Sequence, residues 1–402
     1  MTLVPASTAR IADAVVFFVN GLGLGLWAGH IPILQALHGL DEAALGVTLL
    51  CMALGAIVAM PLTGPAAARY GSRRCTVAAG VVYGLALGLP FLASGPVALA
   101  AAVLLLGAAN GAMDVSMNTQ ASAIERQQGR AIMSSFHAFF SLGGVAGALL
   151  AGLLVASAPT AASGMLPCGM AIAIAVVVAG RWLIADSGHA HGFSLPGRAA
   201  IGVGLLALLA MTAEGAVLDW SAVFIASGTG ATAPVAAMGY AAFSVAMTVG
   251  RLTGDAVVRR LGRGRTLGLS AALAALAILL ALSGGTALAI LGFGIAGLGL
   301  ANAVPVLFSA GAALPGLAPG VGVAMVATMG YAGFLLGPPL IGITAEAAGL
   351  RWALLLVVPG LVVVALAGAR LVGSPAAAPR IRAAGSDASM PPIGDRPARS
   401  RP

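Results

Sequence analysis

The stretch Gly64-Pro-Ala-Ala-Ala-Arg69-Tyr70-Gly71-Ser72-Arg73-Arg74 separates two long apolar runs, and its pattern indicates how the chain folds. It is a short basic connection that follows one apolar run and precedes the next. A comparable stretch, Asp255-Ala-Val-Val-Arg259-Arg260-Leu261-Gly262-Arg263, stands between two apolar runs of the second half of the chain. The shift that superposes the two stretches also brings the run 12–35 onto the run 199–225, which predicts an internally duplicated chain.

The composition excludes a soluble protein. Hydrophobic residues make up 60% of the 402 residues, charged residues only 8%, and the mean hydropathy is +1.03. A soluble domain carries roughly 25% charged residues, so this chain has too few to cover a surface in water. The same figures exclude disorder of the whole chain. Cys51, Cys75 and Cys168 lie far apart without a CxxC pair, so they predict neither a zinc site nor a disulfide framework.

Twelve runs are apolar and long enough to cross a bilayer, which takes about 20 residues. We therefore expect an all-α polytopic membrane protein with twelve transmembrane helices. The first run lacks a short apolar core followed by a small-residue cleavage site, so we interpret it as a membrane helix and not as a signal peptide. The runs are 12–35, 43–67, 75–94, 97–121, 132–156, 164–184, 199–225, 234–258, 266–283, 286–309, 320–346 and 350–371.

The basic residues, all of them arginines, lie mainly in the connections after even-numbered runs and in the C-terminal tail. Arg351 alone lies on the opposite side. Cytoplasmic loops are enriched in arginine and lysine, so we expect both termini to be cytoplasmic and the protein to lie in the inner (plasma) membrane. The isoelectric point is near 10.6 because of these arginines. Their positions fit a signal for membrane orientation better than a nucleic-acid-binding face. Binding of specific lipids is the other reading of these basic runs.

The duplication suggests a division into an N-terminal six-helix bundle (1–185), a cytoplasmic linker (186–198), a C-terminal six-helix bundle (199–372) and a cytoplasmic tail (373–402). The tail is rich in Pro, Ala, Ser and Arg and is expected to be disordered. Parallel halves of this kind are a transporter architecture, with the substrate site between them near the midplane. The pair His189-Ala-His191 falls in the linker, where we expect solvated residues and no metal site.

A polar face on the run 97–121 is the strongest functional signal, because a charged side chain at the bilayer centre costs about 2.5–3.5 kcal/mol on insertion scales. Asn110, Asp114 and Asn118 recur every four residues and share one helical face. His137 in the next run lies at a depth similar to that of Asp114. A carboxylate beside an imidazole can hold or pass a proton. A static hydrogen bond that joins the two helices is the alternative.

Further polar residues mark the runs 12–35 and 199–225. Asn20 and Trp27 share one stripe with Asp13, which lies near the cytoplasmic mouth. Glu214 is predicted to face a cavity, whereas Asp219 is predicted to be a capping or gating contact at the outer mouth. Trp27 and Trp220 lie at comparable depths and could stack on a sugar ring or an apolar ligand, or belong to an interfacial aromatic belt.

Two later runs complete the set of candidates. Arg251 and Asp255 are one helical turn apart, so we expect them to pair near the cytoplasmic end as a gate or structural clamp. Asn302 and Ser309 share a face of the run 286–309, with Pro305 between them as an expected bend.

The stretch from Gly64 to Arg74 resembles the signature between helices 2 and 3 of the major facilitator superfamily. It departs from that signature at Ala68, where an aspartate of a charge network is usual, and at Ser72. Gly143-Gly144-xx-Gly147 and Gly333-xxx-Gly337-Pro338 resemble the helix-packing motifs of the same superfamily. The resemblance implies two pseudo-symmetric six-helix bundles. It also implies gating or conformational roles for a set of residues in or just before the two basic stretches: Arg69, Gly71, Arg73, Arg251, Asp255 and Arg259.

A narrower resemblance rests on two neighbouring stretches, Gly111-Ala-Met-Asp114-Val-Ser-Met-Asn118-Thr-Gln120 and Ser135-Phe136-His137-Ala-Phe-Phe-Ser141-Leu-Gly143. They are similar to the YbjJ-type inner-membrane permeases, a branch near the fucose permeases. The resemblance implies transport of a solute and leaves the solute open.

We therefore expect a monomeric secondary transporter that works by alternating access, with protons as coupling ion and no cofactor. The chain has no lysine, so it has no Walker A motor. A membrane-embedded enzyme is the distant alternative, but neither HExxH nor GxSxG occurs. A channel or a sensor is a further alternative, and no selectivity filter is evident.

Amide groups, an imidazole and a tryptophan suit a polar or sugar-like small molecule. Proton-driven efflux of cationic or lipophilic compounds is the alternative, because the carboxylates of Asp114 and Glu214 could bind a cation. The expected substrate and proton site consists of Asn20, Trp27, Asn110, Asp114, Asn118, His137, Glu214 and Asn302.

Overall fold

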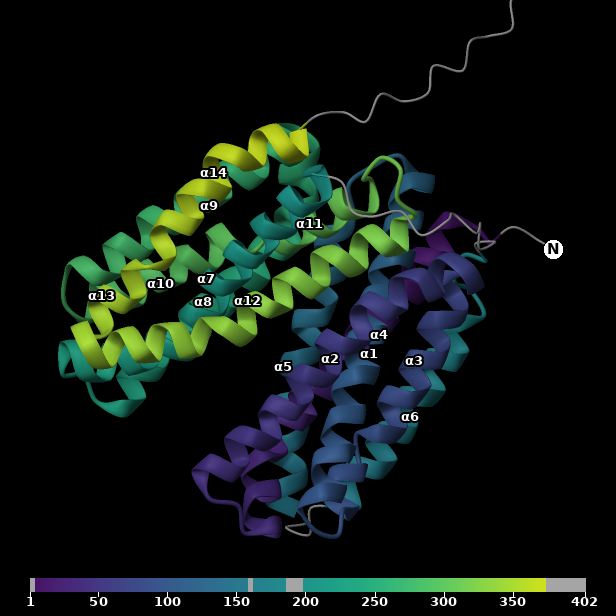
Figure 1. The fold of residues 1–402 in the computed structure, drawn as a ribbon, viewed down its shortest axis with the longest axis horizontal. Coiled ribbons are helices and arrows are strands. Elements are labelled where there is room, and N and C mark those ends of the chain that lie inside the picture. Colours follow the sequence, from purple (N-terminus) through teal and green to yellow (C-terminus); the bar gives the residue numbers. More distant parts are fainter. Residues whose placement is uncertain (1–3, 158–161, 186–197, 374–402) are drawn as a thin grey trace, which may run out of the picture.

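The structure is a computed structural model that describes residues 4–157, 162–185 and 198–373, and every regular element in these ranges is a helix (Figure 1). The first half of the chain, called the N half, contains α1 (Ala6–His38), α2 (Glu42–Tyr70), α3 (Ser72–Ala86), the short 3-10 helix η1 (Leu89–Leu92), α4 (Pro96–Gln128), α5 (Met133–Ser157) and α6 (Ala162–Gly180). The second half, called the C half, contains α7 (Arg198–Thr229), α8 (Ala233–Leu261), α9 (Arg263–Ser283), α10 (Thr286–Leu300), α11 (Ala303–Ala312), α12 (Pro319–Ala348), α13 (Leu350–Leu355) and α14 (Val357–Gly373).

Each predicted run corresponds to one helix or to two successive helices, so the all-α fold is confirmed. Within the described ranges, 11 helices are long and apolar enough to cross a membrane. Three of these spans each combine two successive helical elements: Ser72–Leu92, Thr286–Ala312 and Leu350–Val372. The predicted run 164–184 corresponds to a shorter apolar helix, Gly164–Gly180.

The two basic stretches form the same backbone turn, which supports the duplication. Gly71 between α2 and α3 has φ 89°, and Gly262 between α8 and α9 has φ 77°. Positive φ values are strained for residues with a Cβ atom, so glycine is favoured at both turns. The amide of Gly71 donates to the carbonyl of Ala67 at 3.0 Å, and that of Gly262 to the carbonyl of Val258 at 2.8 Å.

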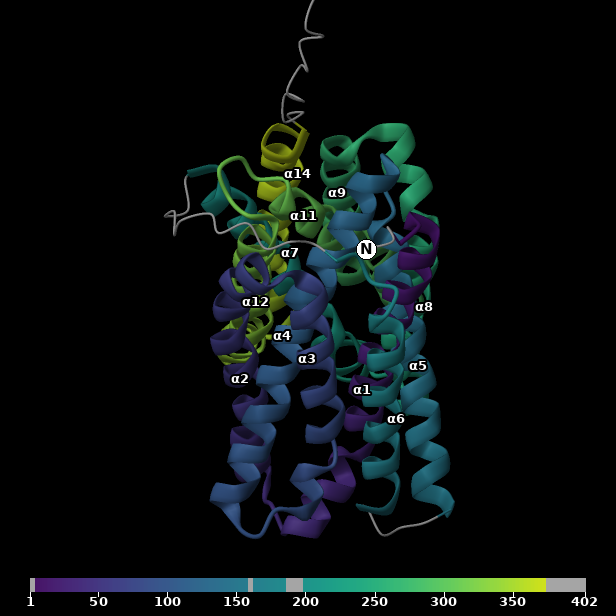
Figure 2. The ribbon, with the colours of Figure 1, turned by 90° about the vertical axis from the view of Figure 1, so that its right-hand side faces the viewer.

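The two halves form separate bundles that meet at one end of the molecule and diverge toward the other (Figures 1 and 2). The meeting end carries the α2–α3, α4–α5 and α8–α9 connections, the start of α1 and the end of α14, and we call it the arginine-rich end. The outer faces of both bundles expose large apolar side chains, such as Leu62, Leu153 and Leu366. An apolar outer face around a polar interior is what a bilayer requires of a helical protein.

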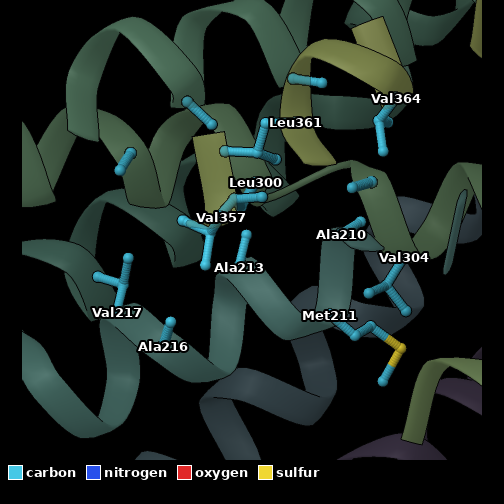
Figure 3. Close-up of a cluster of buried hydrophobic side chains, with 14 of the residues drawn as sticks. Ala210, Met211, Ala213, Ala216, Val217, Leu300, Val304, Val357, Leu361 and Val364 are labelled. Atoms are coloured by element: carbon cyan, nitrogen blue, oxygen red, sulfur yellow. The ribbon is translucent and has the colours of Figure 1, made fainter. Parts of the chain in front are cut away.

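The buried apolar side chains form two clusters. One lies within the N half, and the other lies mainly in the C half but also includes Ala56 and Met60 of α2 and Val115 of α4. Figure 3 shows part of the second cluster. Small residues allow the helices to approach closely. A Cβ atom on Gly143 of α5 would meet the backbone carbonyl of Phe18 on α1, and one on Gly333 of α12 would meet the carbonyl of Leu208 on α7. The glycine motifs predicted from the sequence therefore do pack helices, at equivalent places in the two halves.

Candidate functional site

All eight residues of the predicted substrate and proton site are buried in the structure. They come from α1, α4, α5 and α7 and from the junction of α10 and α11. Buried polar groups in a membrane helix require hydrogen-bond partners, and most of these side chains find theirs on neighbouring helices or within the set. The contacts divide the set into a pair of asparagines, an acid-histidine chain, an ion pair and an asparagine at the boundary between the halves.

The asparagine pair joins α1 to α4 within the N half. Asn20 Nδ2 donates to Asn110 Oδ1 at 3.0 Å and lies 3.5 Å from the sulfur of Met113. The backbone carbonyl of Asn20 accepts a hydrogen bond of 3.0 Å from the hydroxyl group of Tyr83 on α3. Asn110 and Met113 thus orient the Asn20 side chain, and Tyr83 binds its backbone.

A chain of hydrogen bonds connects Asp114 to His137 through Asn118. His137 Nε2 lies 3.1 Å from Asn118 Oδ1, and Asn118 Nδ2 donates to Asp114 Oδ1 at 3.2 Å. The carboxylate and the imidazole, predicted to lie at similar depth, are thus linked through the amide group of Asn118. The second carboxylate oxygen, Asp114 Oδ2, is buried without a hydrogen-bond partner among the described residues.

Aromatic rings from both halves enclose His137. Phe17 of α1 meets the imidazole edge-on at a centroid distance of 5.5 Å, and Phe308 of α11 does so at 5.8 Å. Phe136 stacks on Phe17 at 5.3 Å. Because Phe308 belongs to the C half and Phe17 to the N half, His137 lies at the boundary between the halves.

Arg251 pairs with Glu214 and not with Asp255, so the predicted pair within α8 is wrong. Arg251 Nη2 lies 3.3 Å from Glu214 Oε1, and Nη1 donates to Ser141 Oγ at 2.6 Å. Both members of the ion pair are only 8% exposed. Neighbouring helices supply these acceptors, and they determine the direction in which the guanidinium points.

Hydrogen bonds connect the ion pair of the C half to the acid-histidine chain of the N half. Arg251, which pairs with Glu214, donates to Ser141 Oγ on α5. The same Ser141 hydroxyl group donates to the backbone carbonyl of His137, one turn earlier, at 3.1 Å. Asp114, His137, Glu214 and Arg251 therefore belong to one polar region at the boundary between the halves.

Asn302 and Asp255 hold the start of α5 against the C half. Asn302 Oδ1 accepts a hydrogen bond of 2.8 Å from Ser134 Oγ, and its amide donates to the carbonyl of Gly250 at 3.3 Å. Asp255 Oδ1 accepts from the amide of Ser135 at 3.1 Å. Asp255 Oδ2 lies 3.8 Å from Arg10 Nη2.

Glu125 is a functional candidate that the sequence analysis missed. Its Oε2 pairs with Arg263 Nη2 of α9 at 2.8 Å and also accepts a short hydrogen bond from Ser309 of α11. Its Oε1 accepts from the amide of Ile132 at 3.1 Å. The predicted run ended at residue 121, whereas α4 continues to Gln128. The spacing of seven residues from Asn118, which places both on one face, was the available signal.

The remaining gating candidates lie at the arginine-rich end. The guanidinium of Arg69 stands 5.2 Å from the ring centre of Tyr70, and Gly71 forms the turn described above. Arg73 lies in the first turn of α3. Arg259 Nη1 donates to the carbonyl of Ala131 across the boundary at 3.4 Å. Close to this end, Gly64 of α2 faces Ala324 of α12, where an added Cβ atom would meet the Ala324 methyl at 2.7 Å.

The two tryptophans are placed in different halves. Trp27 is buried in the N half, where it packs edge-on against Phe91 at 6.4 Å. Trp220 packs against the buried cluster of the C half. Trp27 is therefore part of helix packing and not of a lipid-facing belt. Asp219 is exposed.

The described residues contain no group of three or more His, Cys, Asp or Glu side chains that could hold a metal ion. The pair His189-Ala-His191, most of the predicted linker and the tail lie outside the described residues.

Almost all hydrogen bonds and ion pairs that join the two halves start from the end of α4, the α4–α5 connection or the first turns of α5. They include the contacts of Glu125, Ala131, Ser134 and Ser135 with the C half. The arginine-rich end is thus the closed end of the boundary in this structure.

Comparison with known proteins agrees with this geometry. The model of the Major Facilitator Superfamily matches residues 14–202. An uncharacterised MFS-type transporter of Yersinia pestis is 38% identical over 350 residues, which cover 86% of this chain and 91% of the relative. The membrane protein MosC of Rhizobium meliloti is 37% identical over 368 residues, 89% of this chain and 88% of the relative.

Solved structures show the same fold at low sequence identity. FucP in its outward conformation superposes with a TM-score of 0.78 at 17% identity, covering 90% of this chain and 98% of FucP. The proton:xylose symporter XylE superposes with a TM-score of 0.70 at 15% identity, covering 91% of this chain and 96% of XylE. The chain belongs to the major facilitator superfamily of membrane transporters.

Proposed function

We propose that this transporter moves a small polar or sugar-like solute together with protons by alternating access between its two halves. The observation that carries the proposal is the chain from Asp114 through Asn118 to His137. It lies at the boundary between the halves, where a change of conformation exposes it to one side and then to the other.

Asp114 is the residue that we assign to the proton. Its Oδ1 accepts from Asn118, while its buried Oδ2 has no donor within the described ranges and is therefore the oxygen open to protonation. The hydrogen-bond direction also fits, because an Nε2–H of His137 donates toward Asn118, and Asn118 donates toward the carboxylate. A change in the protonation of Asp114 would thus alter the hydrogen bonding of His137, next to Phe308 of the C half.

The state of the boundary supports alternating access. The halves are held together at the arginine-rich end and diverge at the other end (Figure 1). FucP, in the structure that superposes with a TM-score of 0.78, is in an outward conformation. We infer that the arginine-rich end is cytoplasmic, as the arginine distribution predicts, and that the structure represents an outward-facing state.

The substrate class follows from the buried polar groups of the candidate site. Asn20, Asn110 and Asn302 offer amide donors and acceptors, which orient neutral hydroxylated solutes. Arg251 is engaged by Glu214 and Ser141, which disfavours an anionic substrate. Two of the solved structures with this fold are a fucose:proton symporter of E. coli and a proton:xylose symporter.

Efflux of cationic compounds is the second candidate, since two acids lie in this region. The ion pair with Arg251 compensates Glu214, which leaves Asp114 as the one acid of the predicted site without a cationic partner among the described residues. We therefore place this candidate second.

A thermal-shift screen of the purified protein against sugars, amino acids and lipophilic cations tests the substrate class, because a ligand that binds the folded state stabilises it. We expect stabilisation by a neutral polar solute. That solute should then drive alkalinisation outside proteoliposomes on entry. Stabilisation by lipophilic cations alone, lost in Glu214→Gln, would replace this proposal with drug export.

A further inference from the structure

A basic groove at the arginine-rich end lies apart from the polar region described above. Its volume is about 1390 Å³, and both halves contribute to its wall. The N half supplies the end of α4 and the α4–α5 connection, while the C half supplies the α8–α9 turn, the start of α7 and the end of α14.

Six arginines and a single acid line the groove. The arginines are Arg126, Arg130, Arg259, Arg263, Arg265 and Arg370, and the acid is Glu125. Glu125 is already paired with Arg263. Arg130 donates to the amide oxygen of Gln128, and Arg259 to the carbonyl of Ala131, so these two bind neutral acceptors. Among the described residues, the lining of the groove therefore carries an excess of positive charge.

The need to orient the protein in the membrane does not by itself explain why arginines from both halves line one groove. A signal for membrane orientation requires arginines in the correct loops but places no demand on their meeting. Here two connections, far apart in sequence, direct their arginines into one cavity from opposite halves. Like charges brought together repel one another, so an anion in the groove would relieve a cost that the closed end otherwise bears.

Apolar residues also line the groove. They include Val203 of α7, Leu261 of α8 and Leu314 after α11. Guanidinium groups bind phosphate oxygens in a two-pronged geometry, and the apolar wall suits the carbon atoms attached to such a phosphate.

We propose that this groove is a binding site for a phosphate-bearing anion, of which an anionic lipid headgroup and a soluble phosphate are the two possible sources. Arg130 of the N half and Arg265 of the C half contact the same anion. The site is complete only when the arginine-rich end is closed, because separation of the halves moves these arginines apart. The anion therefore stabilises the closed arginine-rich end over the open one.

The test uses the purified full-length protein in a neutral detergent. Its thermal unfolding is followed while phosphatidylglycerol, phosphatidylcholine or inorganic pyrophosphate is added at constant ionic strength. The test variant is Arg130→Gln with Arg265→Gln. The matched control is Arg74→Gln with Arg181→Gln, which removes two exposed arginines that do not line the groove.

We expect phosphatidylglycerol to raise the unfolding temperature of the wild type and the control, and phosphatidylcholine to have little effect. The concentration required should rise more than about tenfold in the test variant. Stabilisation by phosphatidylglycerol alone identifies a lipid headgroup, and an equal effect of pyrophosphate identifies a soluble phosphate. Three results would each overturn the site. The two lipids could raise the unfolding temperature equally, or neither phosphatidylglycerol nor pyrophosphate could raise it. The two double variants could also lose the same amount of stabilisation by the anion. None of these readouts depends on the transported solute.

Discussion

Glu125 of α4 and Arg263 of α9 form an ion pair of 2.8 Å that joins the two halves at the arginine-rich end. Glu125 is buried and also accepts the hydroxyl hydrogen of Ser309 on α11, so a single carboxylate contacts two helices of the C half. The related signature of the superfamily carries an aspartate at the position of Ala68. This chain places its carboxylates instead at Glu125 and at Asp255, which pairs with Arg10.

The first prediction is that Glu125→Gln weakens the closure of the arginine-rich end. Gln retains a hydrogen-bonding oxygen but loses the charge that attracts Arg263. We expect a cysteine at Val306, which is buried beside Glu125, to react with maleimide about 5- to 150-fold faster in this variant. The measurement uses purified protein in which Cys51, Cys75 and Cys168 are replaced.

Two comparisons make this prediction specific. Glu346→Gln removes an exposed carboxylate from the far end of α12 and should leave the reaction rate unchanged. Arg263→Gln should accelerate the reaction as Glu125→Gln does, with no further increase in the double variant. Additive effects of the two substitutions would show that the pair does not act as a unit.

The second prediction is that Asp114→Asn abolishes accumulation driven by a pH gradient and preserves exchange of solute. Asn maintains a hydrogen-bonding oxygen toward Asn118 but cannot take up a proton. Uptake and counterflow in proteoliposomes measure the two activities. Asp219→Asn is the control, because it makes the same chemical change at an exposed position of α7. Accumulation by Asp114→Asn at the wild-type level would refute the proton role.

The third prediction concerns orientation in the membrane. Arg74 is exposed at the arginine-rich end, and Ser283 is exposed at the opposite end. With the arginine-rich end in the cytoplasm, a membrane-impermeant maleimide added to intact cells should label Ser283→Cys and spare Arg74→Cys. Permeabilised cells should show labelling at both positions. The reverse pattern in intact cells would invert the topology.

The helices and the packing glycines were predictable from the sequence because they depend on local patterns. Hydropathy located the membrane runs, and the glycine motif of α5 predicted close helix packing, for which the structure supplies the partner, α1. Hydropathy detects only the hydrocarbon core, however. It therefore ended the fourth run at residue 121 and missed Glu125, although α4 continues to Gln128.

The pairing of buried side chains was not predictable in the same way. Helical spacing correctly placed Arg251 and Asp255 one turn apart on α8. Their ion-pair partners, Glu214 and Arg10, lie on other helices. Asp114 and His137 were placed at similar depth, whereas the bridging role of Asn118 depends on the rotation of α4 and α5 about their axes. Periodicity within one helix contains no information about that rotation relative to a neighbour.

The fourth prediction uses two adjacent glycines of α5. A Cβ atom on Gly143 would overlap the carbonyl oxygen of Phe18 on α1, whereas one on Gly144 would meet nothing closer than the carbonyl oxygen of Gly21 at 3.9 Å. Gly143→Ala should therefore destabilise the protein by about 1–3 kcal/mol, and Gly144→Ala should not. Thermal unfolding of the two variants measures the difference. Equal unfolding temperatures would mean that α1 and α5 separate at little cost.

The last prediction concerns Asp13, which the sequence placed near the cytoplasmic mouth and which the structure buries completely in α1. Neither of its carboxylate oxygens has a hydrogen-bond partner in the part of the chain that the structure describes. A buried polar group without partners costs about 1–3 kcal/mol, so Asp13→Leu should raise the unfolding temperature. Asp255→Leu should lower it, because that substitution removes a carboxylate that binds Arg10 and Ser135. Asp13→Leu should also keep pH-driven accumulation, since Asp13 is fully buried in α1 of the N half and is separate from the hydrogen-bonded chain of Asp114, Asn118 and His137. If Asp13→Leu abolished accumulation while Asp114→Asn preserved it, the proton site would move from the boundary between the halves to the interior of the N half.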